Sequence, residues 1–373
     1  KRFAILNMET VRIKRIIITL TLVVTVIMAA SFLSTSFDKA YAQSVDFKSG
    51  EGTAQSPYII STPKELDNVR YHRDAYFLQR ANIDMSEYKN FTPIGSITFP
   101  FSGHYDGGKY SITNLTVNST DNNVGMFSYI RGGEVINLKI KDSSIRGGYN
   151  VGAFAGINQG SLIGCIADCE VAGIGAVGGI CGLNSGIVKE CGNLGEVKSG
   201  ENGAVGEYAG GICGINHKYI QDSYNRGQIN YGAVGTTYSG GIAGRSGGSS
   251  SALIERTYNV GKVGGKARGE IVGDNMGQSA IKDCFWLTSD LDISAAFGNE
   301  ENSKSDAKYS ISQKEFSQAK TFGCWKEFND LWLYLGNDSY PILRRQYVPV
   351  ESVSFEEAQI QLKPGEEYVY SAK

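Results

Sequence analysis

A pattern of apolar residues and glycines recurs along the middle of this chain, from Val124 to about Trp286. Each copy opens with an apolar or small residue and a glycine, continues with apolar or small residues, and in most cases reaches a second glycine with asparagine close behind. The copies read VGMFSY, VGAFAGIN, VGGICGLN, AGGICGIN, SGGIAG and RGEIVGDN, and they begin at residues 124, 151, 177, 209, 239 and 268. This spacing of 26 to 32 residues predicts stacked supersecondary units with loops of variable length.

The apolar positions of each copy fall into columns that stay apolar or small. The first column is Phe154, Ile180, Ile212, Ile242 and Ile271, beside the small residues Ala155, Cys181, Cys213, Ala243 and Val272. The second column is Leu162, Val188, Ile220, Ile254 and Ile281. Three residues after each of its members comes a mostly small residue, in order Cys165, Cys191, Ser223, Thr257 and Cys284. The third column is Val171, Val197, Ile229 and Val263. A separation of three would put the second column and its followers on opposite faces of a straight strand. We therefore expect a bend or bulge between them, so that both point inward.

Three short β-prone pieces in each unit, separated by glycine and polar residues, predict one coil of a parallel β-solenoid. Helical repeats are disfavoured, because each glycine inside a helix would cost roughly 0.5–1 kcal/mol. Asparagine also recurs in register, at Asn158, Asn184, Asn216 and Asn275 and again at Asn193, Asn225 and Asn259. Stacked every ~4.8 Å, these side chains can hydrogen-bond from coil to coil, so we interpret them as structural ladders rather than as ligand-binding residues.

The glycine and apolar core, followed by Asn and then by Ile, Cys or Ser, Tyr and Asn, resembles the GLUG motif of bacterial exported proteins. That motif also occurs in the streptococcal IgA-cleaving metallopeptidases. The resemblance covers residues 124–285 directly, and the flanks at 52–127 and 309–343 are similar to the usual surroundings of such repeats. It implies an all-β chain with a right-handed, parallel β-helix-like solenoid. It says little about function, because the motif occurs in proteins of differing activity.

The first 42 residues are typical of a bacterial export signal. Met8 is the expected start, a basic region with Arg12 follows, residues 16–33 are apolar, and the small residues Ala40 and Ala42 mark a cleavage site before Gln43. Removing six basic and two acidic residues from totals of 36 and 38 leaves 30 and 36, a net charge of about −6. The exported chain has no dense basic patch, so we expect neither nucleic acid nor, after signal cleavage, a membrane as its partner.

Residues 43–123 are predicted to form an N-terminal cap and the first coils. Residues 57–61 read as a strand and residues 63–70 as a short helix, with Ser61 or Thr62 as N-cap and Pro63 in the first turn. Such a cap would cover the strand groups at the open end of the solenoid. The sequence ITNLTV at 112–117 matches VINLKI at 135–140, so coil stacking is expected to begin before the glycine motif does.

The repeat region 124–286 is expected to give way to a C-terminal capping segment at 287–346. Residues 298–308 read as a polar loop and residues 310–319 as a helix, and large aromatics such as Trp325 and Trp332 could cover the far end of the core. Residues 347–373 change to alternating apolar positions and resemble the first strands of a bacterial Ig-like group 2 domain, of which only a beginning is present.

Candidate catalytic groups are few. Asp106, in HYDGGKY, could be a carboxylate on an exposed strand face, as in β-solenoid lyases and glycoside hydrolases, but Asp-Gly-Gly equally favours a tight turn, which we prefer. A charged column contains Glu190, Asp222, Arg256 and Asp283, and its mixed signs indicate a solvated face. Tyr224 and Tyr258 share another column, which is an aromatic strip suited to sugar rings if it faces outward and core if it faces inward; we favour the core.

The sequence contains no recognisable motif for a metal site, a cofactor site or a catalytic nucleophile. The three histidines, His72, His104 and His217, are far apart, and HExxH, GxSxG, P-loop and Rossmann patterns do not occur. We therefore predict no catalytic, cofactor-binding or metal-binding residues, and the peptidase activity of the IgA-cleaving proteins cannot be carried over. The seven cysteines include the column neighbours Cys165 and Cys191, and we expect most of the cysteines to be buried, reduced thiols rather than cross-coil disulfides.

Two classes of function remain open. The first is a secreted or cell-surface, adhesin-like repeat module. It would be a non-catalytic, monomeric binding or spacer module with a glycan or a host or cell-surface protein as its ligand. Its binding surface would be the loops at 199–208 and 231–238, where insertions leave the stack undisturbed. The second is a carbohydrate-active β-helix enzyme, a lyase or glycoside hydrolase, or the substrate-recognition region of a larger surface peptidase. We favour the first, because the column that holds Glu190 and Asp222 has no second acidic column beside it.

Overall fold

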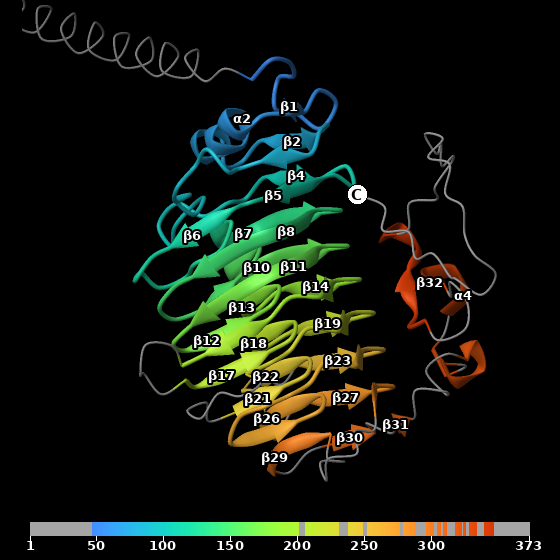
Figure 1. The fold of residues 1–373 in the computed structure, drawn as a ribbon. Helices are drawn as coiled ribbons and strands as arrows, with labels where there is room; N and C mark the ends of the chain where they lie inside the picture. The colour runs from blue at the N-terminus through green and yellow to red at the C-terminus, as the bar shows by residue number, and fades with distance from the viewer. Residues whose placement is uncertain are drawn as a thin grey trace, which may run out of the picture.

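The computed structural model describes residues 47–200, 206–230, 238–248, 252–276, 279–287, 296–301, 304–306, 309–311, 318–322, 324–325, 328–333 and 339–346. Within these residues the chain winds into a stack of parallel coils, a β-solenoid, as Figure 1 shows. The stack begins at β1 (Tyr58–Ile60), just before the helix α2 (Pro63–Asn68), and ends with β29 (Phe297–Glu301), β30 (Lys304–Asp306) and β31 (Tyr309–Ile311). The all-β, parallel solenoid predicted from the repeat is confirmed. The expected export signal and the expected Ig-like strands at 347–373 lie outside the described residues.

The largest sheet has 15 strands in two columns, which the long strands β7 (Phe127–Ile136) and β10 (Ala155–Ile163) both span. The first column continues through β13 (Cys181–Asn184), β18 (Cys213–Asn216), β22 (Ala243–Ser246), β26 (Val272–Met276) and β29. The second comprises β1 (Tyr58–Ile60), β2 (Tyr76–Gln79), β4 (His104–Asp106), then β7 and β10, and then β14 (Ile187–Lys189), β19 (Tyr219–Gln221), β23 (Leu253–Glu255), β27 (Ala280–Lys282) and β30 (Lys304–Asp306).

Two further parallel sheets close each coil. The second sheet contains β3 (Ile83–Asp84), β5 (Ser111–Thr113), β8 (Lys139–Arg146), β11 (Ile166–Gly173), β15 (Gly192–Asn193), β20 (Tyr224–Asn225), β24 (Tyr258–Asn259), β28 (Phe285–Leu287) and β31 (Tyr309–Ile311), with β6 (Thr116–Asn118) on β8 and β16 (Val197–Ser199) on β11. The third contains β9 (Val151–Gly152), β12 (Ala176–Gly178), β17 (Tyr208–Gly210), β21 (Tyr238–Gly240) and β25 (Ala267–Gly269). The predicted apolar columns fill the interior, and Ile180, Ile212 and Val188 are among its fully buried side chains.

The first glycine of each motif marks a turn too tight for a side chain. A Cβ added to Gly210 would lie 2.0 Å from the carbonyl oxygen of Cys213, three residues ahead in the same coil, and one added to Gly240 would lie 2.0 Å from that of Ala243. These contacts are with backbone atoms and cannot be relieved by rotating a side chain. The repeat therefore keeps glycine here for close approach of the chain to itself.

The expected bend between the second apolar column and the cysteine column is a single residue in the left-handed conformation. Glu190 has φ of 54° and Asp222 has φ of 49°, and the same conformation recurs in this column at Asn137, Gly164, Arg256 and Asp283. The reversal lets residues on either side point inward, so that Val188 and Cys191 are both fully buried. The odd spacing in the sequence is thus resolved at this corner, where β14 ends and β15 begins.

The asparagines form the ladders predicted from their register, with one exception. Asn158 donates to Asn184 and Asn184 donates to Asn216, both at 2.9 Å, and in the other ladder Asn193 donates to Asn225 at 2.8 Å. Most of the side-chain oxygens also accept a turn amide, as Asn184 does from Gly186, but that of Asn193 has no hydrogen-bond partner among the described residues. These bonds satisfy groups that would otherwise be buried without partners.

The exception is Asn275, which aligns with Ser246. Its side-chain amide finds no hydrogen-bond partner among the described residues. Asn216 donates to the Ser246 hydroxyl, which pairs with Ser279 instead, so the first ladder ends one level earlier than predicted.

The cysteines lie inside the stack, as expected. Cys165, Cys169, Cys181, Cys191, Cys213 and Cys284 are buried and unbonded to one another, and Cys324 is exposed. Cys181 and Cys213, which pair in register, have sulfur atoms 3.4 Å apart. Burial raises the pKa of Cys169 and Cys284 to about 12, so these thiols stay protonated at neutral pH.

The N-terminal cap is close to its prediction. The helix α2 begins at Pro63, and the Thr62 hydroxyl accepts the Glu65 amide at 3.2 Å while a Glu65 carboxylate oxygen accepts the Ser61 amide at 2.8 Å. Stacking does begin before the glycine motif, through β1, β2 and β4. The predicted register was wrong, however, because Ile112 pairs with Ile140 and not with Val135, whose partner is Tyr105.

The C-terminal boundary differs from the prediction. The repetition does not end at Trp286: within the expected polar loop, β29 and β30 pair with β26 and β27 and add another coil. Ser310, the expected start of a helix, lies in β31 and pairs with Trp286. A 3₁₀ turn occupies Ala319–Phe322, and the residues between lie outside the described part of the chain.

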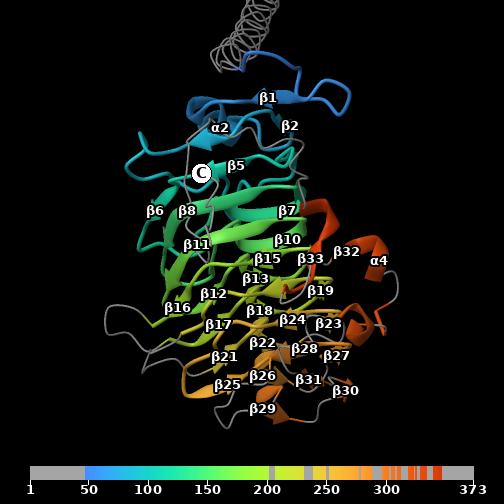
Figure 2. The ribbon, with the colours of Figure 1, turned by 45° about the vertical axis from the view of Figure 1, so that its right-hand side comes forward.

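Residues 318–346, here called the C-terminal segment, lie along the side of the stack and not across its far end (Figures 1 and 2). The segment contains α4 (Phe328–Leu331), the antiparallel pair β32 (Trp332–Leu333) and β33 (Ile342–Leu343), and a 3₁₀ turn at Arg344–Gln346. Its aromatic side chains pack on Tyr224, Tyr258 and Phe285, which belong to the second sheet. The predicted position was wrong because an outward aromatic column offered the segment an apolar surface on the side of the stack.

Candidate functional site

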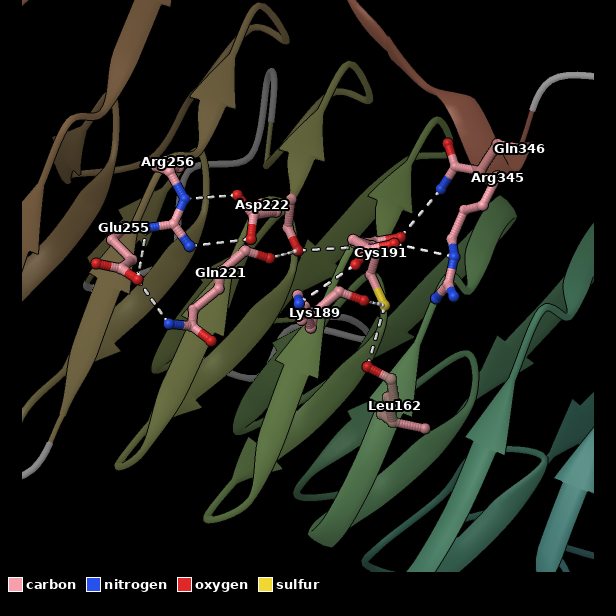
Figure 3. A network of polar contacts seen from close by, with 11 residues as sticks. Leu162, Lys189, Cys191, Gln221, Asp222, Glu255, Arg256, Arg345 and Gln346 are labelled. Carbon is pink, nitrogen blue, oxygen red and sulfur yellow. Dashed lines mark hydrogen bonds and ion pairs between the residues drawn. The ribbon is translucent and has the colours of Figure 1, made fainter. Parts of the chain in front are cut away.

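The charged column predicted from Glu190, Asp222, Arg256 and Asp283 lies at the left-handed corner of the coils. Figure 3 shows Arg256 reaching across to Asp222 on the adjacent coil, with Gln221 and Glu255 beside them. Arg256 binds Asp222 through two hydrogen bonds, of 2.7 and 3.0 Å, and also pairs with Glu255 at 2.7 Å. The side chain of Asp222 is only 1% exposed, so the interpretation of this column as a solvated face was wrong at that level.

The two hydrogen bonds to Asp222 raise the pKa of Arg256 above its ordinary value. A bidentate pair of this kind compensates the cost of burying the carboxylate. Gln221, next to Asp222, donates to Glu255 at 2.6 Å and closes the network. These groups hold adjacent coils together.

Glu190, one coil away, is bound by the C-terminal segment. Arg345 pairs with its carboxylate at 2.9 Å, and the side-chain amide of Gln346 donates to its backbone carbonyl at 3.1 Å (Figure 3). The side-chain carbonyl of Gln346 in turn accepts the Tyr224 hydroxyl at 2.9 Å. Glu190 therefore anchors the C-terminal segment to the stack.

The aromatic column faces out of the coil core but is covered. Tyr224 and Tyr258 stack on each other, with ring centroids 5.3 Å apart, and Trp332 packs against both. The Tyr258 hydroxyl donates to the Pro341 carbonyl at 2.6 Å. Tyr224 is 3% exposed and Tyr258 is fully buried, but they are buried beneath the C-terminal segment and not inside the coils, so the inward orientation favoured from the sequence was wrong.

Asp106 occupies a turn, in agreement with the preferred interpretation. One of its carboxylate oxygens accepts the Gly108 amide at 2.9 Å and the Asn137 side chain at 3.2 Å. Gly108 and Lys109, which follow, have φ of 58° and 67°. The carboxylate thus stabilises a left-handed reversal next to the coil below.

Sequence reasoning did not find a cleft near the N-terminal end of the stack. Its axis is a row of four side chains that pair in register on consecutive coils: Tyr76 with His104, His104 with Glu134, and Glu134 with Ser161. They come from β2, β4, β7 and β10, at the start of the second column of the largest sheet. The spacing of coils makes the row roughly 14 Å long.

The cleft has a volume of about 370 Å³ and is lined by Asp74, Tyr76, Ser102, Gly103, His104, Gly132, Gly133, Glu134 and Ser161. Tyr76 is 40% exposed and stacks on the His104 ring, with centroids 5.4 Å apart and an angle of 26° between the planes. His104 Nδ1 lies 2.9 Å from a Glu134 carboxylate oxygen. One wall is therefore an aromatic ring held in place by an imidazole, which is itself oriented by a carboxylate.

The register error explains why the sequence did not reveal this row. Matching Ile112 to Val135 displaced the early coils by five residues, so His104 and Glu134 were never aligned with each other. Their strands also precede the glycine motif or flank it, where no repeated sequence marks the level. The available signal was the burial alternation of each strand, with Phe77, Tyr105 and Val135 inward and their neighbours outward.

The described residues contain no group of three or more His, Cys, Asp or Glu side chains placed to hold a metal ion. They also contain no helix that is long and apolar enough to cross a membrane. Of the predicted binding loops, residues 201–205 and 231–237 lie outside the described residues.

Comparisons with known proteins give partial matches. The chain is 37% identical over 137 residues to a "Putative Gly-rich membrane protein" of Evansella cellulosilytica, a match that covers 32% of this chain and 15% of that protein. It is 32% identical over 155 residues to the halomucin of Haloquadratum walsbyi, covering 36% of this chain and 2% of that protein. The chain thus spans a small fraction of the length of both relatives. No family model matches it.

One solved structure shares the fold. It is the crystal structure of a "putative immunoglobulin A1 protease" from Bacteroides ovatus, with a TM-score of 0.62 and 20% sequence identity, and the match covers 80% of this chain and 95% of that chain. At this identity the likeness shows the fold alone. The chain is therefore a β-solenoid repeat protein, and its sequence relatives are named as a Gly-rich membrane protein and as halomucin.

Proposed function

We propose that this chain is an exported, surface-displayed repeat module of the GLUG type, which binds or spaces and does not catalyse. The observation that carries the proposal is the way in which the acidic residues singled out in the sequence are held. Asp222 is held by Arg256, Glu190 by Arg345, and Asp106 by a turn amide and Asn137. Carboxylates held in this way are not arranged as the acid and base of glycoside hydrolysis, which need separate roles across an open substrate site.

The names of the relatives support a location at the cell surface, and the export signal expected at residues 1–42 agrees with it. A solenoid suits display, because each coil stabilises its neighbour and the stack presents long, regular faces. The Ig-like strands expected at 347–373 would extend the module away from the surface. The ligand class we favour is a glycan or a host or cell-surface protein.

An enzymatic role is the second candidate. The structural likeness to a protein titled as an IgA1 protease would fit the substrate-recognition region of a larger peptidase. The chain itself has no HExxH zinc motif, so this candidate has no support from a zinc-peptidase sequence.

The proposal is tested on cells that produce the protein. Intact cells are treated with a non-permeant biotin reagent, and a cytosolic enzyme serves as the matched control for leakage. We expect labelling of the chain without labelling of the control, and a mature N-terminus at Gln43 by mass spectrometry. A chain found with its control in the cytosol would overturn the display role.

A further inference from the structure

We propose that the cleft formed by Tyr76, His104 and Glu134 binds a neutral oligosaccharide. This inference rests on the proposed function and names the ligand class and the site of the binding module. The cleft is separate from the loops predicted from the sequence. The residues that form it come from β2, β4, β7 and β10 in the second column of the largest sheet, and Figure 1 shows these strands toward the N-terminal end of the stack.

The aromatic wall favours a sugar ring. The face of an aromatic side chain attracts the slightly positive C–H edges of a pyranose, in the same way that it attracts the edge of another ring. Tyr76 is 40% exposed, and His104 supports one side of its ring. The ring is therefore held in position before a ligand arrives, which reduces the entropy lost on binding.

The polar groups of the cleft match the hydroxyl groups of a sugar. Asp74 and Glu134 supply carboxylate acceptors, and Ser102 and Ser161 supply hydroxyls that both donate and accept. Because His104 Nδ1 lies against Glu134, its Nε2 remains for a ligand. Gly132 lines the cleft with only open space where a Cβ would lie, so a ligand can approach the backbone there.

Charge decides which class of ligand fits. Neither Lys nor Arg lines the cleft, while two carboxylates do, so phosphate, uronate and other anionic ligands are disfavoured. A bare metal ion is disfavoured because no group of three metal-ligating side chains is present among the described residues. The row of side chains is roughly 14 Å long, which exceeds one sugar ring and indicates an oligosaccharide of two or more units.

Isothermal titration with the full exported chain tests the inference. The probes are cello-, laminari-, xylo-, malto- and chito-oligosaccharides of six units, with an oligogalacturonate as the anionic comparison. We expect a Kd of about 1 mM or tighter for at least one neutral probe and weaker binding of the oligogalacturonate. Tyr76→Ala should weaken binding at least about tenfold, Tyr76→Phe should retain it, and Glu134→Gln should weaken it without loss of the circular dichroism spectrum.

Tyr149→Ala is the matched control, because Tyr149 is also a surface tyrosine, 44% exposed, and does not line the cleft. It should bind as the unmodified chain does. Equal binding by the Tyr76→Ala and Tyr149→Ala variants would place the ligand elsewhere and overturn the cleft assignment while leaving surface display intact. Binding of none of the neutral probes, or preference for the oligogalacturonate, would also overturn it.

Discussion

Glu270 is expected to make the stability of the solenoid depend on pH. It occupies the column of Gly179, Gly211 and Gly241, at each of which an added Cβ would meet the ladder asparagine of the same coil. At the next level the asparagine is replaced by Trp286, which pairs with Asn259. The Glu270 carboxylate takes the vacant acceptor role and receives the Asn259 side-chain amide at 3.0 Å, so it ends the second ladder.

Burial raises the pKa of Glu270 from its ordinary value of 4.5 to about 7. Between those two pH values, Glu270 is therefore protonated in the folded chain and ionised in the unfolded chain. The contribution of Glu270 to the free energy of unfolding is fully present below pH 4.5 and is lost as the pH rises toward about 7. The difference between the two pKa values corresponds to a loss of at most about 3 kcal/mol in the free energy of unfolding at pH 8. The main cause of the raised pKa is burial, and Glu270 is 8% exposed.

Replacing the carboxylate by an amide tests this reasoning. Glu270→Gln keeps an oxygen that can accept from Asn259 and cannot ionise. We expect urea denaturation to show a variant more stable than the unmodified chain by up to about 3 kcal/mol at pH 8, with the difference shrinking toward zero at pH 4. Glu87→Gln, at an exposed position, is the control and should change little. A Glu270→Gln effect that is the same at pH 4 and pH 8 would refute the burial of an ionisable group here.

Three further predictions concern the ladders, the C-terminal segment and the thiols. Asn225→Ala removes bonds to Asn193, Asn259 and Gly227 and should cost about 3 kcal/mol in urea denaturation, whereas a loss below about 1 kcal/mol would show that the ladder is not structural. Arg345→Ala leaves the Glu190 carboxylate with Lys189 as its ion-pair partner, and it should lower the free energy of unfolding by about 1 kcal/mol and speed tryptic cleavage of residues 318–346. Unchanged cleavage would contradict the position of the C-terminal segment on the side of the stack. A thiol reagent should modify the exposed Cys324 in the native chain and the six buried cysteines only after unfolding. Two or more disulfides in the unfolded chain would overturn the expectation of reduced thiols.

The repeat allowed the coils to be predicted, because glycine, apolar and asparagine positions each have one structural role at every level. Gly210 is required by a backbone contact, Ile212 by the core and Asn225 by a ladder, so their columns could be aligned without a structure. The coils outside the motif had no such marker. There the register of Ile112 was misjudged, and the coil formed by β29 and β30 was taken for a loop because its strands are polar.

The roles of charged and aromatic side chains could not be predicted from their columns alone. Whether Asp222 is solvated depends on Arg256, 34 residues later, which has the left-handed backbone of the same corner and reaches back to the carboxylate. Whether Tyr224 is exposed depends on the C-terminal segment, whose Gln346 is 122 residues away in sequence. Contacts between segments with different sequence patterns leave no periodic signal. The position of the C-terminal segment on the side of the stack therefore could not be predicted from periodicity, and neither could the row of side chains that begins at Tyr76.

Incubation with polysaccharides tests the central claim most directly. The purified exported chain is mixed with neutral polysaccharides, and both retention on the polymer and release of new reducing ends are measured, with Asp106→Asn as a parallel sample. A non-catalytic binding module predicts retention without new reducing ends, and no difference in product between the two samples. Robust release of reducing ends that Asp106→Asn abolishes would contradict the account and establish a carbohydrate-active enzyme.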